Sequence, residues 1–578
     1  MKKLLLYPFL AVLFLALPAR TPAQSPSIQD FFKSYFEESL KEDPEYATNV
    51  GRHEYDDRWT DLSRAGREAR IAHLRARLAD LGNYRLESLS EQDQLSARLL
   101  KYELTSQLEA NDLQTHLLRV GQLYGFHNRV YLTMDRMPAR TPKDYQNILA
   151  RLHAIPAYVD QNLAILDEAI AEGWVQPKIV VDLVSNQIAA QIAQEKKESA
   201  LLAPFRNFPS NFTAEQQTKL REEADSFYDK EFVPSWRKLQ NYITGTYAPK
   251  ARKTDGIGGT PGGKEAYAIL VRRLTTTNTT PEEIHKKGEE ELARLEAEML
   301  AIARETGFAG TLKEFEQTLD ARPDMHFRSK EEMLVYSRNI AKIVEPELPN
   351  LFRRIPLMLY GVRPIPPDRE AATATNAQAP APDGSVPGWF NLNTYQPEKQ
   401  VRYDKQALVL HEAVPGHVFQ GSVARSLTNI PEFRKFYGNS AYAEGWALYC
   451  ESLGGKLGLY KDPYDRFGQL ASERFRAVRL VVDTGMHSQG WTREQAIAFF
   501  KEHAPQQSLA EIDRYISWPG QALSYKMGQL EIMKLRKEAE QKLGAKFDIR
   551  EFHDVILRDG ALPLQLLDEQ GEKYINAK

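Results

Sequence analysis

The sequence predicts a mainly α-helical protein with a small β-sheet. Apolar residues recur at every third or fourth position in most long segments, which is the period of an amphipathic helix. The alternation of apolar and polar residues that marks a half-buried strand is scarce. With 578 residues, of which 42% are hydrophobic, the chain is long enough to build a large core from two or more packed units.

The first 23 residues have the layout of a secretory signal peptide. Lys2 and Lys3 form a basic start, an apolar run covers residues 4–17, and Thr21 and Ala23 place small residues before a cleavage point. The apolar run is shorter than the roughly 20 residues that cross a bilayer as a helix, which favours a cleaved signal over a retained anchor. We therefore expect an exported protein, periplasmic or secreted, with no membrane attachment once the signal is removed.

Composition excludes some classes of partner. The formal net charge is −3, and it becomes −6 when the three basic residues of the signal are removed, so a nucleic-acid partner is not expected. The single cysteine, Cys450, excludes an internal disulfide, and no cysteine follows the apolar run to take a lipid. The oligomeric state is left open.

Helices are expected in order along the chain. The first begins at Ile28 and ends before Pro44, and residues 89–108 and 142–171 carry apolar residues at helical spacing. Thr280 is a strong helix start, because a hydroxyl N-cap is followed by proline and two acidic residues. Strand-like alternation is clearest near residues 386–395.

Two loop-like stretches divide the chain. Residues 251–264, rich in glycine, separate a helical N-terminal region (24–250) from a helical catalytic region (251–578). Residues 363–388, rich in proline and alanine, are expected to form a surface loop close to the site. The glycine stretch looks like a phosphate-binding loop only superficially, because Glu265 stands where Ser or Thr should bind magnesium. A flexible loop is the better interpretation.

The run HEAVPGH at residues 411–417 is the candidate metal site. Zinc needs three protein ligands and a nearby carboxylate that takes a proton from water. His411 and His417 are six residues apart, and on a regular helix of about 100° per residue they would point some 240° apart. Pro415 and Gly416 interrupt the helix between them, which is expected to return His417 to the metal side. The alternative is a structural histidine pair.

The third ligand is expected on a second helix. Glu444 and Glu451 are seven residues apart and share one helical face. Glu444 lies among small and aromatic neighbours and is the preferred ligand. Glu451 is the fallback ligand, and is better interpreted as a group that supports a ligand from behind or lies on the surface.

Four motifs resemble the bacterial domain-of-unknown-function 885 family: HEAVPGH, AYAEGWALY, VDTGMHSQGWTREQAI and YISWPGQALSYKMG, in this order. The family is similar to mainly helical zinc peptidases with a deep substrate cleft, so the resemblance implies a zincin-like metallopeptidase with a small sheet at the active site. It implies Zn2+ held by His411, His417 and Glu444, with Glu412 as general base. Val418 stands where the family often has a further histidine.

Residues 473–487 carry a polar line on one helical face, formed by Arg476, Arg479, Asp483 and His487. One interpretation is an ion-pair row in which Arg479 and Asp483 satisfy each other. The other places His487 near the metal, where it donates to the oxyanion or holds substrate, and brings Arg476 to a substrate carboxylate.

The last motif suggests a tyrosine for the oxyanion. By resemblance Tyr525 stabilises the tetrahedral oxygen, and Lys526 or Arg514 holds a terminal carboxylate. A core tyrosine beside a lysine that extends to solvent is the alternative. The strand WFNLNTY is interpreted as a sheet edge that binds extended substrate, with Asn391 and Asn393 on one side.

Together these features predict a zinc-dependent peptidase acting on peptides outside the cytoplasm. A carboxypeptidase-like exopeptidase is favoured by resemblance, and an oligopeptidase is close behind. The rival hypothesis is a non-catalytic exported peptide-binding protein that retains the cleft. Glu412 argues against it, because a carboxylate beside a metal histidine has an obvious chemical task.

Overall fold

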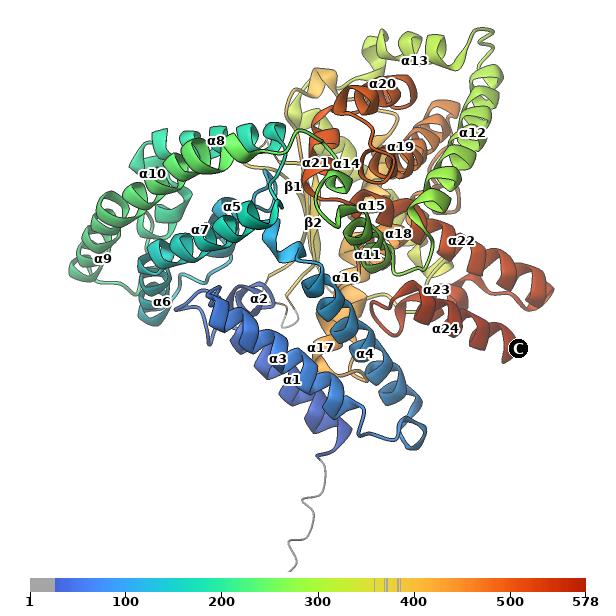
Figure 1. The fold of residues 1–578 in the computed structure, drawn as a ribbon. Coiled ribbons are helices and arrows are strands. Elements are labelled where there is room, and N and C mark those ends of the chain that lie inside the picture. Colours follow the sequence, from blue (N-terminus) through green and yellow to red (C-terminus); the bar gives the residue numbers. More distant parts are fainter. Residues whose placement is uncertain (1–25, 358, 368–369, 371–372, 382–383, 385) are drawn as a thin grey trace, which may run out of the picture.

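Helices make up most of the molecule, which confirms the prediction of a mainly α fold (Figure 1). The computed structural model describes residues 26–578 except 358, 368–369, 371–372, 382–383 and 385. The predicted signal peptide, residues 1–23, lies outside the described residues. In the part of the chain that is described, no helix combines the length and the hydropathy needed to cross a membrane.

The first ten helices precede the glycine-rich stretch. They are α1 Ile28–Glu42, α2 Pro44–Asn49, α3 Arg64–Leu81, α4 Glu91–Asp112, α5 Phe126–Met134, α6 Pro142–His153, α7 Ile155–Glu172, α8 Lys178–Ala193, α9 Ala214–Phe227 and α10 Val233–Tyr242.

The remaining helices follow it. They are α11 Gly263–Thr275, α12 Pro281–Glu305, α13 Leu312–Asp320, α14 Lys330–Val344, α15 Lys405–Glu412, α16 His417–Ser426, α17 Glu432–Lys435, α18 Ser440–Glu451, α19 Pro463–His487, α20 Arg493–His503, α21 Ala510–Ser517, α22 Ser524–Leu543, α23 Ile549–Leu557 and α24 Leu564–Asn576.

Local sequence signals account for several of these boundaries. Thr280 caps α12 as predicted: its hydroxyl accepts from the backbone of Glu283, whose carboxylate accepts from the Thr280 backbone. The expected helix over 142–171 is instead two helices, α6 and α7, which meet at Ala154. Pro156 lies in the first turn of α7, where its missing N–H costs no intrahelical hydrogen bond.

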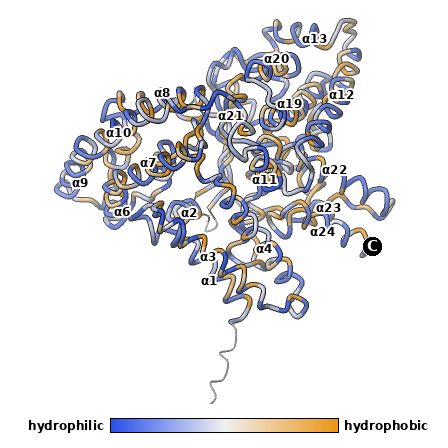
Figure 2. The backbone as a smooth tube through the Cα atoms, in the orientation of Figure 1, coloured by the Kyte–Doolittle hydropathy of each residue, from blue (hydrophilic) through white to orange (hydrophobic). Residues whose placement is uncertain are grey.

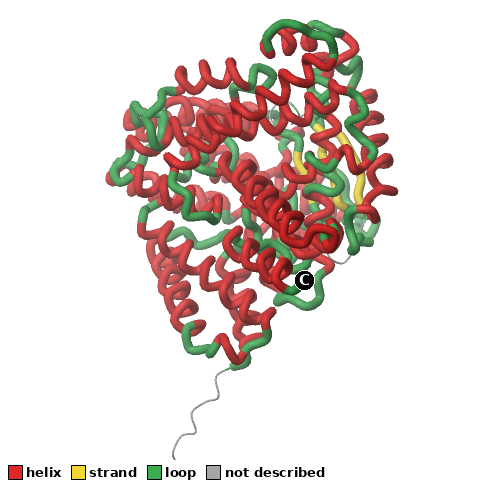
Figure 3. The backbone as a smooth tube through the Cα atoms, turned by 90° about the vertical axis from the view of Figure 1, so that its right-hand side faces the viewer, coloured by secondary structure: helices red, strands yellow, loops and turns green. Residues whose placement is uncertain are grey.

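The sheet has three strands, β1 Tyr360–Pro364, β2 Asn376–Gln378 and β3 Gly388–Leu392, in the order β1-β3-β2. β3 pairs parallel with β1 and antiparallel with β2. Figure 3 shows the three strands together at one side of the helical body. The strand predicted near residues 386–395 exists, but the prediction that it forms a sheet edge is wrong. β2 comes from the proline- and alanine-rich stretch that was expected to be a loop, and it covers one side of β3.

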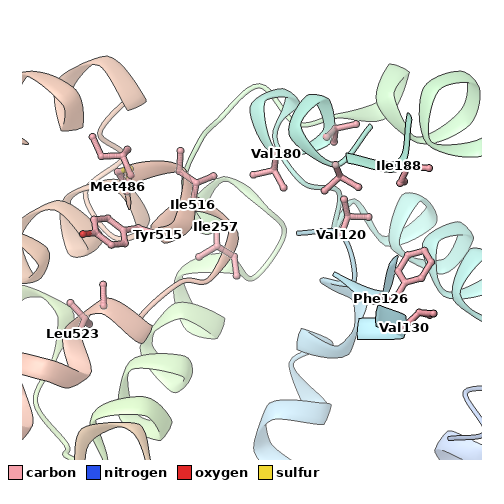
Figure 4. Packing of buried hydrophobic residues seen from close by; sticks show 14 of the residues in the cluster. Val120, Phe126, Val130, Val180, Ile188, Ile257, Met486, Tyr515, Ile516 and Leu523 are labelled. Atoms are coloured by element: carbon pink, nitrogen blue, oxygen red, sulfur yellow. The ribbon is translucent and has the colours of Figure 1, made fainter. Parts of the chain in front are cut away.

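Two hydrophobic clusters form the interior. One extends in sequence from Trp59 to Met527 and the other from Ile28 to Ile575, so each joins segments from both sides of residue 250. Figure 4 shows part of the first cluster, with Val120 and Val180 on one side and Ile257 and Ile516 on the other. The outer helices, such as α9, are largely hydrophilic (Figure 2). The boundary at 250/251 stays a prediction.

The glycine-rich stretch packs closely on the end of α19, which corrects its interpretation as a flexible loop. A Cβ atom added to Gly256 would lie 1.9 Å from the Met486 carbonyl oxygen, and one added to Gly258 would lie 2.5 Å from that of His487. The Ile257 backbone N–H donates to His487 Nδ1 at 3.0 Å. Glycine is therefore required here for close backbone approach.

Buried histidines predict a loss of stability in acid. His553 is fully buried between the Leu351 carbonyl and the Tyr449 hydroxyl, and burial lowers its pKa to about 3. Below pH 6.5 the unfolded chain takes up a proton that the folded chain refuses, so the free energy of unfolding falls, by about 2 kcal/mol between pH 6.5 and 5 for this one group.

Urea unfolding of wild type and His553→Gln at pH 7, 6 and 5 checks this. The variant is expected to lack that share of the pH dependence, whatever its stability at pH 7. Equal pH slopes for the two proteins would contradict the assignment.

Candidate metal centre

The HEAVPGH run is broken as its proline and glycine predict. Helix α15 ends at Glu412 and helix α16 begins at His417, so residues 413–416 are not helical. Within them the Val414–Pro415 peptide bond is cis. The hypothesis that the helix must be interrupted between the two histidines is confirmed, because His411 lies in the last turn of α15 and His417 begins α16. Helices α15 and α16 are both labelled near the centre of the molecule in Figure 1.

Gly416 and Trp446 hold this break in place. A Cβ atom on Gly416 would lie 1.8 Å from the His411 carbonyl oxygen, a separation that no side chain can tolerate. The Trp446 indole N–H donates to the Pro415 carbonyl at 2.9 Å. Because Trp446 belongs to α18, this hydrogen bond also fixes the helix that carries Glu444 against the break.

His411, His417 and Glu444, called the metal group below, converge on one point. Glu444 Oε2 lies 3.1 Å from His417 Nε2 and 3.6 Å from His411 Nε2, and the three ligand atoms lie within 4.8 Å of one another. Zinc bonds to nitrogen and oxygen are about 2.0–2.2 Å long, so tetrahedral geometry sets ligand atoms roughly 3.4 Å apart. The observed separations on Glu444 bracket that value, and the donor set fits zinc.

Glu451 supports the metal group from behind. Its Oε1 lies 2.8 Å from His411 Nδ1, and the carboxylate is fully buried. A carboxylate on the far nitrogen fixes the tautomer and directs Nε2 toward the ligand position. Arg476 Nη2 lies 3.5 Å from the same oxygen. The burial of Glu451 excludes a surface role, and the geometry favours the supporting role over that of a ligand.

The charges of the metal group are those of a cation site. Burial alone would lower the pKa of His411, but hydrogen bonds to Glu444 and Glu451 raise it to about 9. Burial alone would raise the pKa of Glu444, yet His417 and His411 hold it well below its ordinary value. Positive charge at this point therefore stabilises both carboxylates, and a divalent cation can supply it in place of a proton.

Glu412 is the unengaged acid of the site. It is 8% exposed, and with the part of the chain that the structure describes its carboxylate makes no hydrogen bond. Burial raises its pKa, while the neighbouring imidazoles of His411 and His417 act in the opposite direction. A buried carboxylate without a partner, next to two ligand histidines, is able to accept a proton from water.

Tyr525 reaches the metal group because α18 and α22 approach closely at a pair of glycines. A Cβ atom on Gly445 of α18 would lie 2.4 Å from Gly528 of α22, and one on Gly528 would lie 1.9 Å from the Ala441 carbonyl oxygen. This contact stacks the Tyr525 ring on His411, with centroids 6.2 Å apart and an angle of 16°. Arg514 Nη2 donates to the Tyr525 hydroxyl at 3.4 Å.

The structure corrects two of the predicted site residues. His487 does not reach the metal group: Nδ1 accepts from Ile257 N–H, Nε2 lies 2.9 Å from the Tyr515 carbonyl, and no ring nitrogen is left for an oxyanion. Lys526 is 0% exposed and forms ion pairs with Glu473 and Glu291, at 2.6 and 2.8 Å. Two carboxylates already neutralise its charge, so it cannot hold a substrate carboxylate.

The predicted asparagine contacts with substrate also fail. The Asn391 amide bonds to Asn376 and Arg363, on the strands beside it. The Asn393 amide donates to the carbonyls of Glu370 and Thr373, both at 2.7 Å. Both amides therefore bond to the segment that joins β1 to β3 or to the neighbouring strands. They are engaged in this way because β3 is the central strand of the sheet.

The ion-pair row predicted on α19 is replaced by contacts with other elements. Asp483 accepts from the Tyr267 hydroxyl and from Gly520 N–H. Arg479 donates to Glu511 at 2.8 Å and to the Tyr515 hydroxyl at 3.1 Å, and its Cζ lies 4.4 Å from the centroid of the Tyr525 ring. The sequence did not predict that Arg479 is a neighbour of Tyr525, because the periodicity of α19 does not show which residue of another helix packs against it.

Comparison with known proteins identifies relatives over nearly the whole chain. The family model described as "Bacterial protein of unknown function (DUF885)" matches residues 44–570. A candidate lipoprotein from Colwellia psychrerythraea has a similar structure, with a TM-score of 0.90, 25% identity, and coverage of 96% of this chain and 99% of that chain. A candidate lipoprotein of unknown function from Shewanella oneidensis has a TM-score of 0.73 and 21% identity, and the match covers 94% of this chain and 99% of that chain.

A candidate oligoendopeptidase F from Bacillus anthracis gives a TM-score of only 0.31 at 14% identity, covering 88% of this chain and 96% of that chain. That likeness is too low to support an argument. No curated protein matches the chain.

Gly416→Ala is expected to abolish metal binding. The added methyl group would strike the His411 carbonyl and force the break to open, which separates His411 from His417. We expect zinc affinity, measured by isothermal titration calorimetry, to fall at least about 100-fold. Gly455→Ala is the matched control, because a Cβ atom there meets nothing within 4 Å. Equal affinities for the two variants would contradict the account of the break.

Glu451→Gln tests the carboxylate behind His411. The amide keeps the shape of the side chain but loses the charge that orients and polarises the imidazole. Zinc affinity is expected to fall about 10–100-fold while the far-ultraviolet circular dichroism stays that of wild type. An unchanged affinity would show that Glu451 is not coupled to the metal group.

Proposed function

The chain belongs to the DUF885 family of bacterial proteins, and from the geometry of its site we propose that it is a zinc-dependent peptidase. The observation that carries this proposal is the position of Glu412. It follows His411 directly, lies buried beside the metal group and makes no hydrogen bond within the described chain. A site built only to hold a structural ion has no use for such a carboxylate.

Each residue then has a chemical task. When bound, zinc supplies Lewis-acid activation of a water molecule and of the scissile carbonyl. Glu412 takes the proton of the attacking water and passes it to the leaving amine, so that hydrolysis yields one new carboxylate and one new amino terminus. The Tyr525 hydroxyl donates to the developing oxyanion, and the adjacent Arg514 stabilises the negative charge there.

Arg479 supports the tyrosine rather than the substrate. Its guanidinium lies over the Tyr525 ring and is held there by Glu511 and Tyr515. The metal group is anchored in the same way by Glu451 and Trp446. Such support suits catalysis, since groups fixed before the substrate binds need no reorganisation in the transition state.

The proposal includes a zincin-like arrangement with a deep substrate cleft, and a substrate that is a peptide outside the cytoplasm. The predicted signal peptide supports export, as does the description of the Colwellia and Shewanella relatives as candidate lipoproteins. The choice between a carboxypeptidase-like exopeptidase and an oligopeptidase is not decided by the metal group, because both use the same chemistry.

The alternative is a non-catalytic exported protein that binds peptides in the same cleft. Such a protein would not need Glu412 ionisable, buried and unpaired at once, since an unpaired buried carboxylate destabilises the fold. Turnover therefore separates the two functions.

Glu412→Gln is expected to bind zinc like wild type but to lose hydrolysis. Without the general base, kcat should fall about 10²–10⁴-fold on any peptide that wild type cleaves. Zinc content by mass spectrometry and peptide cleavage by liquid chromatography measure the two properties separately. Glu432→Gln, in a half-exposed side chain, is the control. Equal cleavage by wild type and Glu412→Gln would reject the proposed function.

A further inference from the structure

Three guanidinium groups surround the tyrosine beside the metal group. The Cζ atoms of Arg476, Arg479 and Arg514, called the arginine cluster below, lie 5.9, 4.4 and 5.9 Å from the centroid of the Tyr525 ring. They come from two helices, α19 and α21, that pack against each other. So dense a set of cations at one aromatic ring requires an explanation.

The carboxylates within reach do not balance the arginine cluster. Arg479 and Arg514 share a single acid, Glu511, at 2.8 and 2.9 Å. Arg476 approaches Glu451, but that carboxylate is engaged by His411. Within the described chain, Arg476 Nε and Arg479 Nη1 are buried without a hydrogen-bond partner. A buried cation in excess of its acids is costly unless a further anion arrives.

Part of the cluster is accessible to solvent, and so is part of the metal group. The side chains of Arg476 and Arg514 are 12% and 15% exposed, while those of His417 and Glu444 are also partly exposed. Arg514 donates to the Tyr525 hydroxyl at 3.4 Å, the hydroxyl that we assign to the scissile carbonyl. Successive residues of a peptide lie about 3.8 Å apart, so an anion on Arg514 would be one residue beyond the cleaved bond.

An aromatic surface lies next to Arg514. The Arg514 Cζ is 5.9 Å from the centroid of the Trp518 ring, and Trp518 meets Tyr124 edge to face at 4.8 Å. Tyr124 is 58% exposed although it is a large apolar side chain. The segment that carries it is tied to α21, because the Gln122 amide donates to the Asp513 carbonyl at 2.8 Å. An apolar side chain from a ligand can cover these two rings.

Resting on the peptidase function proposed above, we infer that the arginine cluster is a subsite for a free C-terminal carboxylate. Arg514 and Arg476 bind the terminal carboxylate, and Trp518 and Tyr124 contact the side chain of the last residue. The protein is then a carboxypeptidase that removes large apolar residues, because one residue separates the bound carboxylate from the hydrolysed bond. An acidic side chain carries the same chemistry, and the test distinguishes it from the chain terminus.

The test uses zinc-loaded wild-type protein and four short peptides. The first is a tetra-alanine chain ending in Phe with a free carboxylate, and the second is the same peptide as a C-terminal amide. The third is an amide that ends in Glu-Phe, and the fourth is a free acid that ends in Gly. Rapid cleavage of the last bond is expected only in the free acid that ends in Phe. Amidation should reduce kcat/KM about 10–100-fold, since charge-assisted hydrogen bonds are lost. Replacement of Phe by Gly should reduce it about 10-fold or more.

Variants check the residues. Arg514→Gln should raise KM for the free-acid Phe peptide about 10–100-fold and so remove most of the preference for the acid over its amide. The loss of oxyanion stabilisation lowers kcat for both peptides alike and cancels in that ratio. Trp518→Ala should remove the preference for Phe over Gly. Arg550→Gln, in an exposed side chain, is the control and should behave as wild type.

Each outcome decides something. Equal cleavage of the acid and amide peptides, or faster cleavage of the Glu-Phe amide than of the acid, would overturn the carboxylate subsite and leave the peptidase function intact. If the zinc-loaded protein cleaves none of the four peptides, the peptidase function is contradicted, and the subsite with it. The comparison of acid and amide needs no variant, so it holds even if Arg514→Gln does not fold.

Discussion

The four residues between α15 and α16 are the constraint on which the site depends. On a regular helix the side chains of His411 and His417 would point in different directions, and these four residues turn them toward the same point. They can do so only because Gly416 has no side chain that would strike the His411 carbonyl. The Trp446 indole, bonded to the Pro415 carbonyl, then sets the position of α18 and so of Glu444. The backbone contact of Gly445 with Gly528 then fixes α22 against α18, and so the position of Tyr525.

Around this point the protein buries more charge than a stable core needs. Removing an ion from water costs several kcal/mol even after relaxation, so buried charges persist only with partners or a function. Glu444 and Glu451 have the two imidazoles, and Glu511 has two guanidinium groups. Glu412 and the spare donors of the arginine cluster have none in the described chain. Water, zinc and an anionic peptide end are the species that would complete them.

Local patterns predicted most of the helices and the break at Pro415 and Gly416, because these depend on residues close in sequence. The convergence of Glu444 with His411 and His417 is a contact between separate helices, and it was expected from the ligands that zinc requires and from the family resemblance. Other contacts between distant elements were beyond the reach of local patterns. Lys526 was assigned to substrate because Glu473 and Glu291 cannot be seen from α22 alone. His487 was assigned to the metal because the glycine-rich stretch that binds it lies 230 residues away. The strand β3 was predicted to be a sheet edge because β2, which pairs with it, lies in a stretch whose composition is typical of a loop.

Anomalous diffraction from crystals grown with zinc tests the central claim most directly. Data collected on both sides of the zinc absorption edge locate the metal independently of any assumed ligand. The account predicts a strong peak about 2.0–2.2 Å from His411 Nε2, His417 Nε2 and a Glu444 oxygen, with Glu412 close by and not bonded to the metal. A peak held by other residues, or no peak at the metal group in zinc-saturated crystals, would contradict it.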